Sequence, residues 1–301
     1  RRFRPRPHFA GLTGPEIMTD PSTLIAFQGA PGANSDIACR EAYPDMTTLS
    51  CGTFVDAFGA VKNGDAALAM IPIDNTVAGR VADIHHLLPD SGLHIIAEHY
   101  ERINHQLLVL PGTDISEIKG IHSHVHALSQ CRTLIEDLGV AAMVHLDTAG
   151  AAADVAKWGD KTKAAIATRL AGEIYGLDLI RSDIEDAEHN TTRFVVLSRD
   201  SVIPDAGSGN VMTSFVFRVR NIPAALYKAM GGFSTNGVNM TKLESYVGAG
   251  FIAAQFYAEV EGHPEDGPLK LALEELGFFS EELTILGVFP ADPFRKEAVP
   301  E

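Results

Sequence analysis

The strongest constraint on the fold is a regular alternation of apolar strand-like runs and helical segments along the first two thirds of the chain. Residues 23–29 (TLIAFQG) have the pattern of a buried strand that ends in a glycine turn, and the next segment predicts a helix beginning near Asn34 or Ser35. Residues 54–64 then predict a second helix and residues 66–74 a second buried strand. Because strands joined through a helix run parallel, this order predicts an α/β fold with a parallel sheet.

The alternation continues to about residue 200 and then stops. Further strands are predicted at 105–111, 141–147, 163–168 and 192–200, with helices at 126–139, 148–159 and 169–176. Residues 201–210 follow, and their Pro, Gly and Ser content is typical of a linker. We therefore predict one α/β domain over residues 22–200 and a domain boundary at this linker.

After the linker the order of elements changes. The patterns predict a strand at 211–220, a helix at 223–237, a hairpin of strands 238–247 and 251–262 around residues 248–250, a helix at 267–281 and a strand at 283–290. A βαββαβ order is that of the ferredoxin-like fold. We therefore predict a second, smaller α/β domain at residues 211–293.

Composition argues against several classes of function. A net charge of −15 disfavours nucleic acid as a partner, and no apolar run approaches the roughly 20 residues that a membrane helix needs. The cysteines Cys39, Cys51 and Cys131 lack CxxC spacing, so we expect reduced thiols and no zinc site. The basic start of the chain is followed by no signal-peptide region. We expect residues 1–20 to be a disordered tail or an expression remnant, and the protein to be cytoplasmic.

Residues 28–35 (QGAPGANS) form a glycine-rich turn from a strand into a helix. The segment lacks GK[ST] and the full GxGxxG spacing, so it is neither a P-loop nor a dinucleotide fingerprint. The N–H groups at the start of the helix, at Ala33, Asn34 and Ser35, could hold an anion at the positive end of the helix dipole. The alternative is a tight turn that binds nothing.

Residues 72–79 (PIDNTVAG) follow a buried strand and place Asp74, Asn75 and Thr76 at its carboxyl end. Open α/β sheets bind ligands at this edge, so the three polar side chains are candidates for substrate contacts. The alternative is an Asx turn, in which these side chains bond only to neighbouring backbone.

Residues 121–131 (IHSHVHALSQC) contain three histidines spaced two residues apart. His-x-His spacing can place two imidazoles on one face, but no carboxylate accompanies them at metal-binding spacing. We expect no metal and no cofactor, and interpret Ser123 as a hydroxyl at a helix N-terminus with His126 in the first turn. In residues 147–152 (DTAGAA), Thr148 is expected to cap a helix in the same way.

Residues 189–194 (HNTTRF) stand in front of a buried strand. Thr191 and Thr192 could satisfy turn backbone while Arg193 lies at the surface, or these side chains could belong to a reaction centre. Five strand ends in this chain carry small polar turns, and such loops would line one cleft between two α/β lobes. Their convergence favours the reaction centre.

Taken together, these motifs resemble the prephenate dehydratase family with a C-terminal regulatory ACT domain, over about residues 23–295. The opening glycine turn matches that of the family, and the Thr-Arg-Phe signature is intact at Thr192, Arg193 and Phe194. The resemblance implies an α/β, two-lobed catalytic domain like that of periplasmic binding proteins, with a second subdomain at about residues 103–182, plus the ferredoxin-like ACT domain.

Two family motifs are present with replacements. The Pro-Ile-Glu-Asn-Ser motif is found with Asp74 in place of Glu and Thr76 in place of Ser. The Ser-His-Pro-Gln-Ala-Leu…Gln-Cys motif is found with Val125 in place of Pro and His126 in place of Gln.

The C-terminal domain resembles an ACT domain less completely. Residues 237–245 (GVNMTKLES) fit one ligand-contact motif, and the glycine of the Pro-Gly-Ala-Leu motif is replaced by Ala224. The resemblance implies that L-Phe is an effector and binds where two ACT domains meet. The predicted effector contacts are Ala224, Ala225, Leu226, Asn236, Gly237, Val238, Asn239, Met240, Glu244 and Ser245.

The resemblance implies a hydro-lyase of phenylalanine biosynthesis that converts prephenate to phenylpyruvate with loss of water and carbon dioxide. Hydroxide is a poor leaving group, so the departing hydroxyl needs a proton or a strong hydrogen-bond donor. Thr192 is the first choice for this donor, with Asn75 and Ser123 as further catalytic candidates. The predicted substrate contacts are Ala33, Asn34, Ser35, Asp74, Thr76, His126, Thr148, Ala149, Arg193 and Phe194.

Two other functions stay open at this point. An arogenate dehydratase would use the same site on an amino-bearing substrate, and a non-catalytic amino-acid or ligand sensor would keep the same two domains. The intact Thr-Arg-Phe signature favours an enzyme. The family is typically dimeric or tetrameric, so we expect a homodimer or homotetramer whose partners are prephenate and L-Phe, with no nucleic acid and no membrane.

Overall fold

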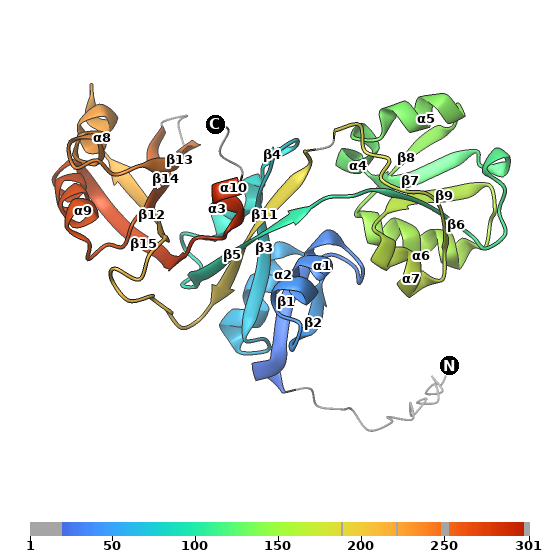
Figure 1. The fold of residues 1–301 in the computed structure, drawn as a ribbon, viewed down its shortest axis with the longest axis horizontal. Coiled ribbons are helices and arrows are strands. Elements are labelled where there is room, and N and C mark those ends of the chain that lie inside the picture. Colours follow the sequence, from blue (N-terminus) through green and yellow to red (C-terminus); the bar gives the residue numbers. More distant parts are fainter. Residues whose placement is uncertain (1–19, 188, 221, 248–252, 298–301) are drawn as a thin grey trace, which may run out of the picture.

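The computed structural model describes residues 20–187, 189–220, 222–247 and 253–297. The tail expected at residues 1–20 lies, apart from its last residue, outside these ranges, and the hairpin turn expected at 248–250 lies outside them entirely. The described chain forms two lobes and a C-terminal domain, with the first lobe between the other two (Figure 1).

The first lobe takes its strands from two separate parts of the chain. Its elements are η1 (Pro21–Thr23), β1 (Leu24–Gln28), α1 (Asn34–Ala42), β2 (Thr47–Cys51), α2 (Phe54–Asn63), β3 (Leu68–Asn75), β4 (Gly79–Arg80), α3 (Ala82–Leu87), β5 (His94–Arg102) and β11 (Thr191–Ser198). β1 runs parallel to β2 and β3, whereas β11 lies antiparallel between β3 and β5. The sheet is therefore mixed and not wholly parallel as predicted, because β11 returns from the second lobe.

The second lobe is inserted between β5 and β11. Its elements are β6 (Gln106–Val109), η2 (Ile115–Glu117), β7 (Gly120–His124), α4 (Val125–Ser129), α5 (Arg132–Leu138), β8 (Ala141–His145), α6 (Thr148–Trp158), β9 (Lys163–Ala167), α7 (Arg169–Tyr175) and β10 (Asp178–Arg181). They form a five-stranded sheet of order β10-β6-β9-β7-β8. Two chain segments therefore connect the lobes, one on each side of this insertion.

The C-terminal domain has the predicted βαββαβ order. Its elements are β12 (Val211–Val219), α8 (Ala225–Thr235), β13 (Met240–Val247), β14 (Ala253–Glu261), α9 (Gly267–Phe279), β15 (Ser280–Pro290) and α10 (Phe294–Glu297). Its strand order is β13-β14-β12-β15, and β15 then pairs with β5 of the first lobe. The first lobe and the C-terminal domain therefore share one ten-stranded sheet.

One glycine makes this shared sheet possible. Gly287 of β15 is the register partner of Ile95 in β5. A Cβ atom at Gly287 would lie 2.2 Å from the backbone oxygen of Ile95 and 2.6 Å from its Cβ. Only a residue without a side chain allows the two strands to approach this closely.

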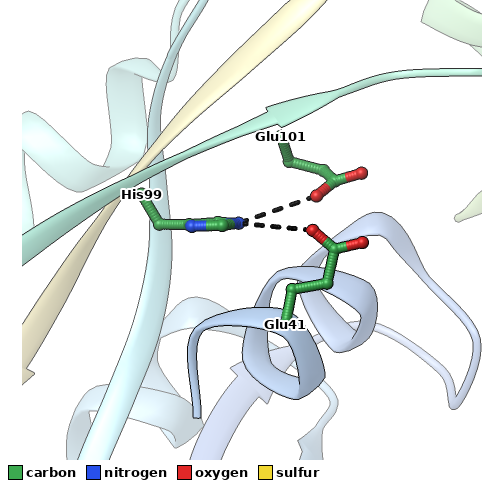
Figure 2. Close-up of side chains that lie close together, drawn as sticks. All are labelled: Glu41, His99 and Glu101. Atoms are coloured by element: carbon green, nitrogen blue, oxygen red, sulfur yellow. Dashed lines mark ion pairs between the residues drawn. The ribbon is translucent and has the colours of Figure 1, made fainter. Parts of the chain in front are cut away.

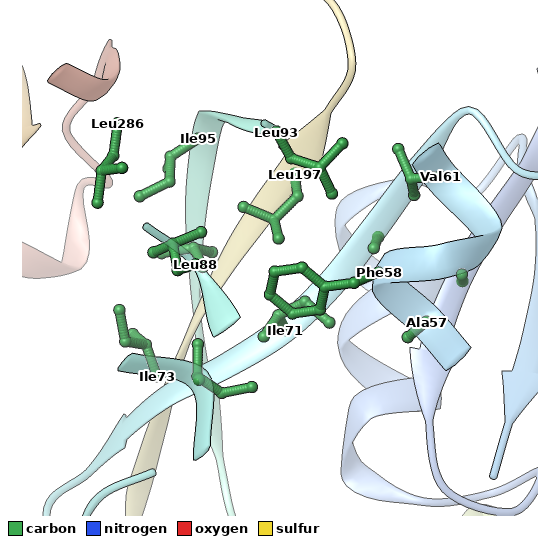
Figure 3. Close-up of a cluster of buried hydrophobic side chains, with 14 of the residues drawn as sticks. Ala57, Phe58, Val61, Ile71, Ile73, Leu88, Leu93, Ile95, Leu197 and Leu286 are labelled. Carbon is green, nitrogen blue, oxygen red and sulfur yellow. The ribbon is translucent and has the colours of Figure 1, made fainter. Parts of the chain in front are cut away.

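Two apolar clusters bind the three parts together. The larger cluster joins strands and helices of the first lobe to the C-terminal domain, and includes Phe58, Ile71 and Ile95 beside Leu286 (Figure 3). A second cluster joins Phe27 and Phe194 of the first lobe to Leu108 of the second. Burial of apolar area against both neighbours stabilises the arrangement of the first lobe between them.

Several predicted boundaries were wrong. No strand was predicted at β2, which is polar and partly exposed, or at β5, which is rich in histidine and charged side chains. The helix expected at 126–139 is two helices, since the carboxylate of Asp186 accepts hydrogen bonds from the N–H groups of Arg132 (2.9 Å) and Thr133 (3.3 Å) and starts α5 there. In the part of the chain that the structure describes, no helix is both long enough and apolar enough to cross a membrane.

Candidate active site

A cavity of about 590 Å³ lies between the two lobes, where β1 and β3 of the first lobe and β7 and β8 of the second end. Its lining residues are Gln28, Gly29, Ala33, Asn34, Ser35, Phe54, Pro72, Asn75, Ala78, Gly79, Arg80, Val81, Ala82 and Asp83 from the first lobe, and His124, His126, Leu146, Asp147 and Thr148 from the second. Many of the predicted contacts are thus brought together: Ala33, Asn34, Ser35, Asn75, His126 and Thr148.

The starts of two helices differ in what they offer an anion. α1 begins at Asn34, and its N-cap residue, Ala33, makes no side-chain capping hydrogen bond. The first N–H groups of α1 are therefore available to a negatively charged ligand. α6 begins at Thr148 and is capped by the carboxylate of Asp147, which accepts from the N–H of Gly150. The cap predicted at Thr148 was therefore wrong by one residue. The first turn of α1 also carries the buried carboxylate of Asp36, which accepts from the N–H of Gly32 at 2.8 Å.

Thr192 is held by the side chain of Asn75. The two residues are register partners on β11 and β3, and Asn75 Nδ2 donates to Thr192 Oγ1 at 2.9 Å. The orientation of the Asn75 amide is fixed, because its Oδ1 accepts from the N–H groups of Val77 (2.9 Å) and Ala78 (2.6 Å). Since the oxygen of Thr192 accepts from Asn75, its own proton is free to point at a ligand.

The hydrogen bonds continue from Asn75 into the segments that connect the lobes. Asn75 Nδ2 also donates to Asn190 Oδ1 at 2.8 Å, and Asn190 Nδ2 donates to Gln130 Oε1 at 2.9 Å. His105 Nε2 lies 2.9 Å from the same oxygen of Gln130. Asn190 and His105 are buried, and burial lowers the pKa of His105. None of these three partners was predicted as a site residue, although the sequence carries Gln130 within a family motif.

Seven predicted site residues are not among the lining residues of the cavity: Asp74, Thr76, Ser123, Ala149, Thr192, Arg193 and Phe194. Of these, Thr192 contacts the lining residue Asn75. Ser123 is fully buried in β7 and its Oγ donates to the carbonyl of Ile166 at 2.6 Å. The helix next to it begins one residue later than expected, because His124 is the N-cap of α4. Ala149 and Phe194 are core residues. Thr76 fastens the loop in front of Thr192, because its Oγ1 donates to the carbonyl of His189 at 2.6 Å and accepts from the N–H of Thr191.

Arg193 is buried on the opposite face of β11 from Thr192. The structure therefore places it neither at the surface, which was the alternative, nor among the cavity-lining residues, where a substrate contact was expected. Its guanidinium contacts Glu98 of β5 at 2.8 Å and Glu259 of β14 at 2.8 Å. Burial alone would lower the pKa of Arg193, but the two carboxylates raise it above its usual range. Burial of Glu259 would raise the pKa of its carboxyl group, but the charge of Arg193 lowers that pKa to about 2. Arg193 therefore connects the first lobe to the C-terminal domain.

Strand β13 of the C-terminal domain contacts the residues around Asn75. Lys242 Nζ pairs with the carboxylate of Asp74, which also lies 3.7 Å from Arg193. Glu244 pairs with Arg80, a cavity-lining residue, at 3.3 Å. Asp74 is not among the lining residues, so the structure directs this predicted substrate contact toward the C-terminal domain.

One group of side chains among the described residues has the spacing of a metal site: Glu41, His99 and Glu101 (Figure 2). His99 Nε2 lies 3.9 Å from Glu41 and 3.6 Å from Glu101. Burial raises the pKa of Glu41, and the charge of Glu101 raises it further. Because Glu41 is exposed, the group lacks the closed surroundings of a built metal centre.

The C-terminal domain contains a second cavity, of about 540 Å³, at the start of α8. Ala224, Ala225, Leu226 and Ser245 of the predicted effector contacts line it. Ala224 has φ 63°, the left-handed conformation that the family's glycine would adopt easily. The other predicted contacts do not line this cavity: Asn236, Gly237, Val238, Asn239 and Met240 follow the far end of α8, and Glu244 pairs with Arg80.

Comparisons with known proteins agree with this geometry. The family model "Prephenate dehydratase" matches residues 25–202. A bifunctional N-acyl-homoserine lactone acylase/prephenate dehydratase of Komagataeibacter europaeus is 53% identical over 91% of this chain and 98% of its own length. Arogenate dehydratase/prephenate dehydratase 1 of Arabidopsis thaliana is 35% identical over 92% of this chain and 74% of its own.

A solved structure shares the whole arrangement of lobes and C-terminal domain. Prephenate dehydratase of Arthrobacter aurescens, in complex with L-Phe, superposes with a TM-score of 0.81 at 29% identity, covering 89% of this chain and 90% of its own. The fold is accordingly the two-lobed type related to periplasmic binding proteins, followed by a ferredoxin-like domain. The chain belongs to the prephenate dehydratase family, whose members are hydro-lyases.

Proposed function

We propose that this protein converts prephenate to phenylpyruvate in phenylalanine biosynthesis, with Thr192 as the hydrogen-bond donor to the departing hydroxyl. The observation that carries the proposal is the contact from Asn75 Nδ2 to Thr192 Oγ1, because Asn75 lines the cavity between the lobes and Thr192 lies directly behind it. A hydroxyl whose oxygen already accepts a hydrogen bond is a stronger donor, because each bond polarises the next. This polarisation supports a role for a weakly acidic threonine in the loss of water.

The remaining chemistry is placement of a dicarboxylate. Loss of carbon dioxide and hydroxide makes the ring aromatic, so the substrate supplies the driving force. The uncapped start of α1, at Ala33, Asn34 and Ser35, holds one carboxylate through N–H groups. His126 and Thr148 contribute polar groups from the second lobe. Exclusion of water between the lobes strengthens each of these contacts.

The buried candidates support the site without touching substrate. Thr76 orders the loop before Thr192, and Ser123 joins β7 to β9 through the carbonyl of Ile166. Ala149 and Phe194 hold the lobes together through the apolar core that they share. We assign Asp74 and Arg193 to the contact with the C-terminal domain.

Replacement of the donor tests the proposal. Thr192→Ala should lower kcat for prephenate by about a hundredfold or more, the usual contribution of a positioned proton donor, and Thr192→Ser should keep much of the activity. Phenylpyruvate formation measures both. Thr191→Ala is the matched control, because it removes a threonine hydroxyl from the neighbouring residue, whose side chain lies on the opposite face of β11. Wild-type turnover by a folded Thr192→Ala protein would reject the assignment.

Arogenate is the nearest alternative substrate, because relatives named arogenate dehydratase are up to 35% identical to this chain. Arogenate carries an amino group where prephenate has the keto group of its side chain. Asp83 and Asp147, both at the cavity, could pair with that group. The ratio of kcat/KM for the two substrates decides between them, and a ratio in favour of arogenate would correct our proposal.

N-acyl-homoserine lactone acylase activity is a second candidate function. It is favoured by the Komagataeibacter europaeus relative, which carries both activities in its name and matches 91% of this chain. His124 and His126 line the cavity with ring centroids 5.1 Å apart, and burial lowers the pKa of His124. A neutral imidazole there could activate a water molecule for amide hydrolysis. Release of fatty acid from an N-acyl-homoserine lactone tests this, and the absence of release with active dehydratase rejects it.

We further propose that residues 211–293 form an ACT domain that binds L-Phe and inhibits the enzyme, with residues 22–200 as the catalytic domain and 201–210 as the linker. The Arthrobacter aurescens relative was solved with L-Phe, which supports the effector. The contacts of β13 with Asp74 and Arg80 offer a direct route from that domain to Asn75.

A further inference from the structure

A continuous chain of hydrogen bonds runs from Thr192 to His105, a residue outside the cavity. Asn75 donates to Thr192 and to Asn190, Asn190 donates to Gln130, and His105 Nε2 lies 2.9 Å from the same oxygen of Gln130. All of these distances are between 2.8 and 2.9 Å, which is ordinary for strong contacts between side chains.

This hydrogen-bond chain has one consistent set of donors and acceptors. Gln130 Oε1 accepts from Asn190, so His105 Nε2 must carry a proton and donate to the same oxygen. If His105 carried its proton only on Nδ1, its Nε2 would be an acceptor, and the Gln130 amide would have to flip so that its NH2 group faces Nε2. The Asn190 amide would then have to flip as well, which would place its NH2 group against the NH2 group of Asn75. The proton on His105 Nε2 therefore agrees with the orientation that polarises Thr192.

The members of the chain come from every part of the two-lobed domain. Asn75 belongs to the first lobe and Gln130 to the second, while His105 and Asn190 lie in the two segments that connect the lobes. Backbone hydrogen bonds join these segments, from Ile103 to Asn190 (2.8 Å) and from Ile184 to His105 (3.0 Å). The N–H of His105 also donates to Glu185 at 2.8 Å. This hydrogen-bond chain therefore spans both lobes and both connecting segments.

We propose that His105 is a positioning residue for the dehydration, which acts through Gln130 and Asn190 to hold the Asn75 amide toward Thr192. The inference rests on the proposed function, because it concerns the same donor. It assigns a second task to the connecting segments. They join the lobes and also carry the hydrogen bonds that prepare the reactive hydroxyl.

Substitutions of different reach test the role of His105. His105→Gln can place an amide N–H near the position of Nε2, whereas the shorter His105→Asn cannot, and His105→Phe removes the donor. We expect His105→Phe and His105→Asn to lower kcat for prephenate on the order of ten- to hundredfold with KM changed less than about twofold, since misplacement of a reacting group acts on the chemical step. His105→Gln should recover most of kcat. His263→Phe, at a buried histidine of the C-terminal domain, is the matched control.

A double substitution separates positioning from a general loss of stability. If His105 acts through Asn190, then His105→Phe combined with Asn190→Leu should lose little more kcat than Asn190→Leu alone, because the chain is broken only once. Additive losses, or a His105→Gln protein as slow as His105→Asn, would overturn the inference. If wild-type protein shows no Thr192-dependent turnover of prephenate, the proposed function fails. If that turnover is present but His105→Phe leaves kcat unchanged, only the inference about His105 fails.

Discussion

At the scale of single residues, Ala224 keeps a left-handed backbone conformation that glycine favours, although the glycine itself is replaced. The family motif has glycine at this position, and the structure keeps a glycine-like backbone, with φ 63° and ψ 13°, immediately before α8. An alanine in the left-handed region costs roughly 1–2 kcal/mol. The turn before α8 therefore carries strain that comes from this one methyl group.

Ala224→Gly should relieve that strain. The gain is offset in part by the greater freedom of glycine in the unfolded chain, so we expect the free energy of unfolding to rise by up to about 1 kcal/mol. Urea denaturation of the two proteins measures the difference. Ala229→Gly is the control, because Ala229 lies in the interior of α8, where glycine costs at least roughly 0.5–1 kcal/mol. Equal destabilisation by both substitutions would show that the turn is not strained.

The sequence predicted single residues well where their chemistry is local. Asn75, the start of α1 and Thr192 each follow or precede an apolar run that is easy to recognise. Asn75 and the start of α1 line one cavity, and Thr192 contacts Asn75. It did not predict the partners of Arg193. Glu98 and Glu259 lie 95 and 66 residues away along the chain, and only the register of β5, β11 and β14 brings them together. The Asn190–Gln130–His105 chain was missed for the same reason.

At the scale of elements, α3 joins the first lobe to the C-terminal domain through a histidine. His85 is 1% exposed, and its ring stacks edge-on against Tyr257 of β14 with centroids 5.2 Å apart. Its Nδ1 lies 3.4 Å from the hydroxyl of Tyr246, while its Nε2 is buried without a hydrogen-bond partner. Burial, assisted by the charge of Lys242, lowers the pKa of His85 to about 4.

The folded protein should therefore lose stability as the pH falls from about 6.5 to about 4. In this window His85 is protonated in the unfolded chain but neutral in the folded one, so acid favours unfolding. The full effect is on the order of 3 kcal/mol. His85→Phe should flatten the pH dependence of the unfolding free energy, measured in urea at several pH values. His86→Phe, at the exposed neighbouring histidine, should leave it unchanged. Parallel pH profiles for wild type and His85→Phe would contradict this account.

Elements were predicted from the sequence where apolar spacing is strong, as in α2, α6 and the C-terminal βαββαβ order. They were missed where an element is short, exposed or rich in charge, as in β2, β5 and β10. The break between α4 and α5 depends on Asp186, which lies more than fifty residues further along the chain. Local periodicity contains no information about a cap supplied from so far away.

At the scale of the whole molecule, the predicted effector contacts fall into separate groups. Ala224, Ala225 and Leu226 stand at the start of α8, and residues 236–240 follow its end. The 11 residues of α8 separate these two groups by about 16 Å, so one L-Phe molecule cannot touch both within one chain. If both groups bind the effector, they belong to different protomers, which supports the proposal of a homodimer or a larger assembly.

Complementation tests this arrangement. Leu226→Ala and Asn239→Ala should each abolish the heat of L-Phe binding and the inhibition by L-Phe, because each removes one half of every site. Co-expression of the two variants should restore part of both, since a mixed dimer has one site with neither substitution. Titration calorimetry and activity assays measure the outcome. No heat with wild-type protein would reject L-Phe as effector, and no recovery in the mixed protein would reject the two-protomer site.

The close approach of Gly287 to Ile95 has a consequence for how such a protein can be divided. The C-terminal domain continues the sheet of the first lobe, and the apolar cluster around Ile95 and Leu286 extends across the boundary. Removing residues 211–297 would leave β5 with an unpaired edge beside an uncovered apolar face, a combination that promotes aggregation. The C-terminal domain is therefore not a detachable module. Without it, the first lobe lacks part of its own structural support.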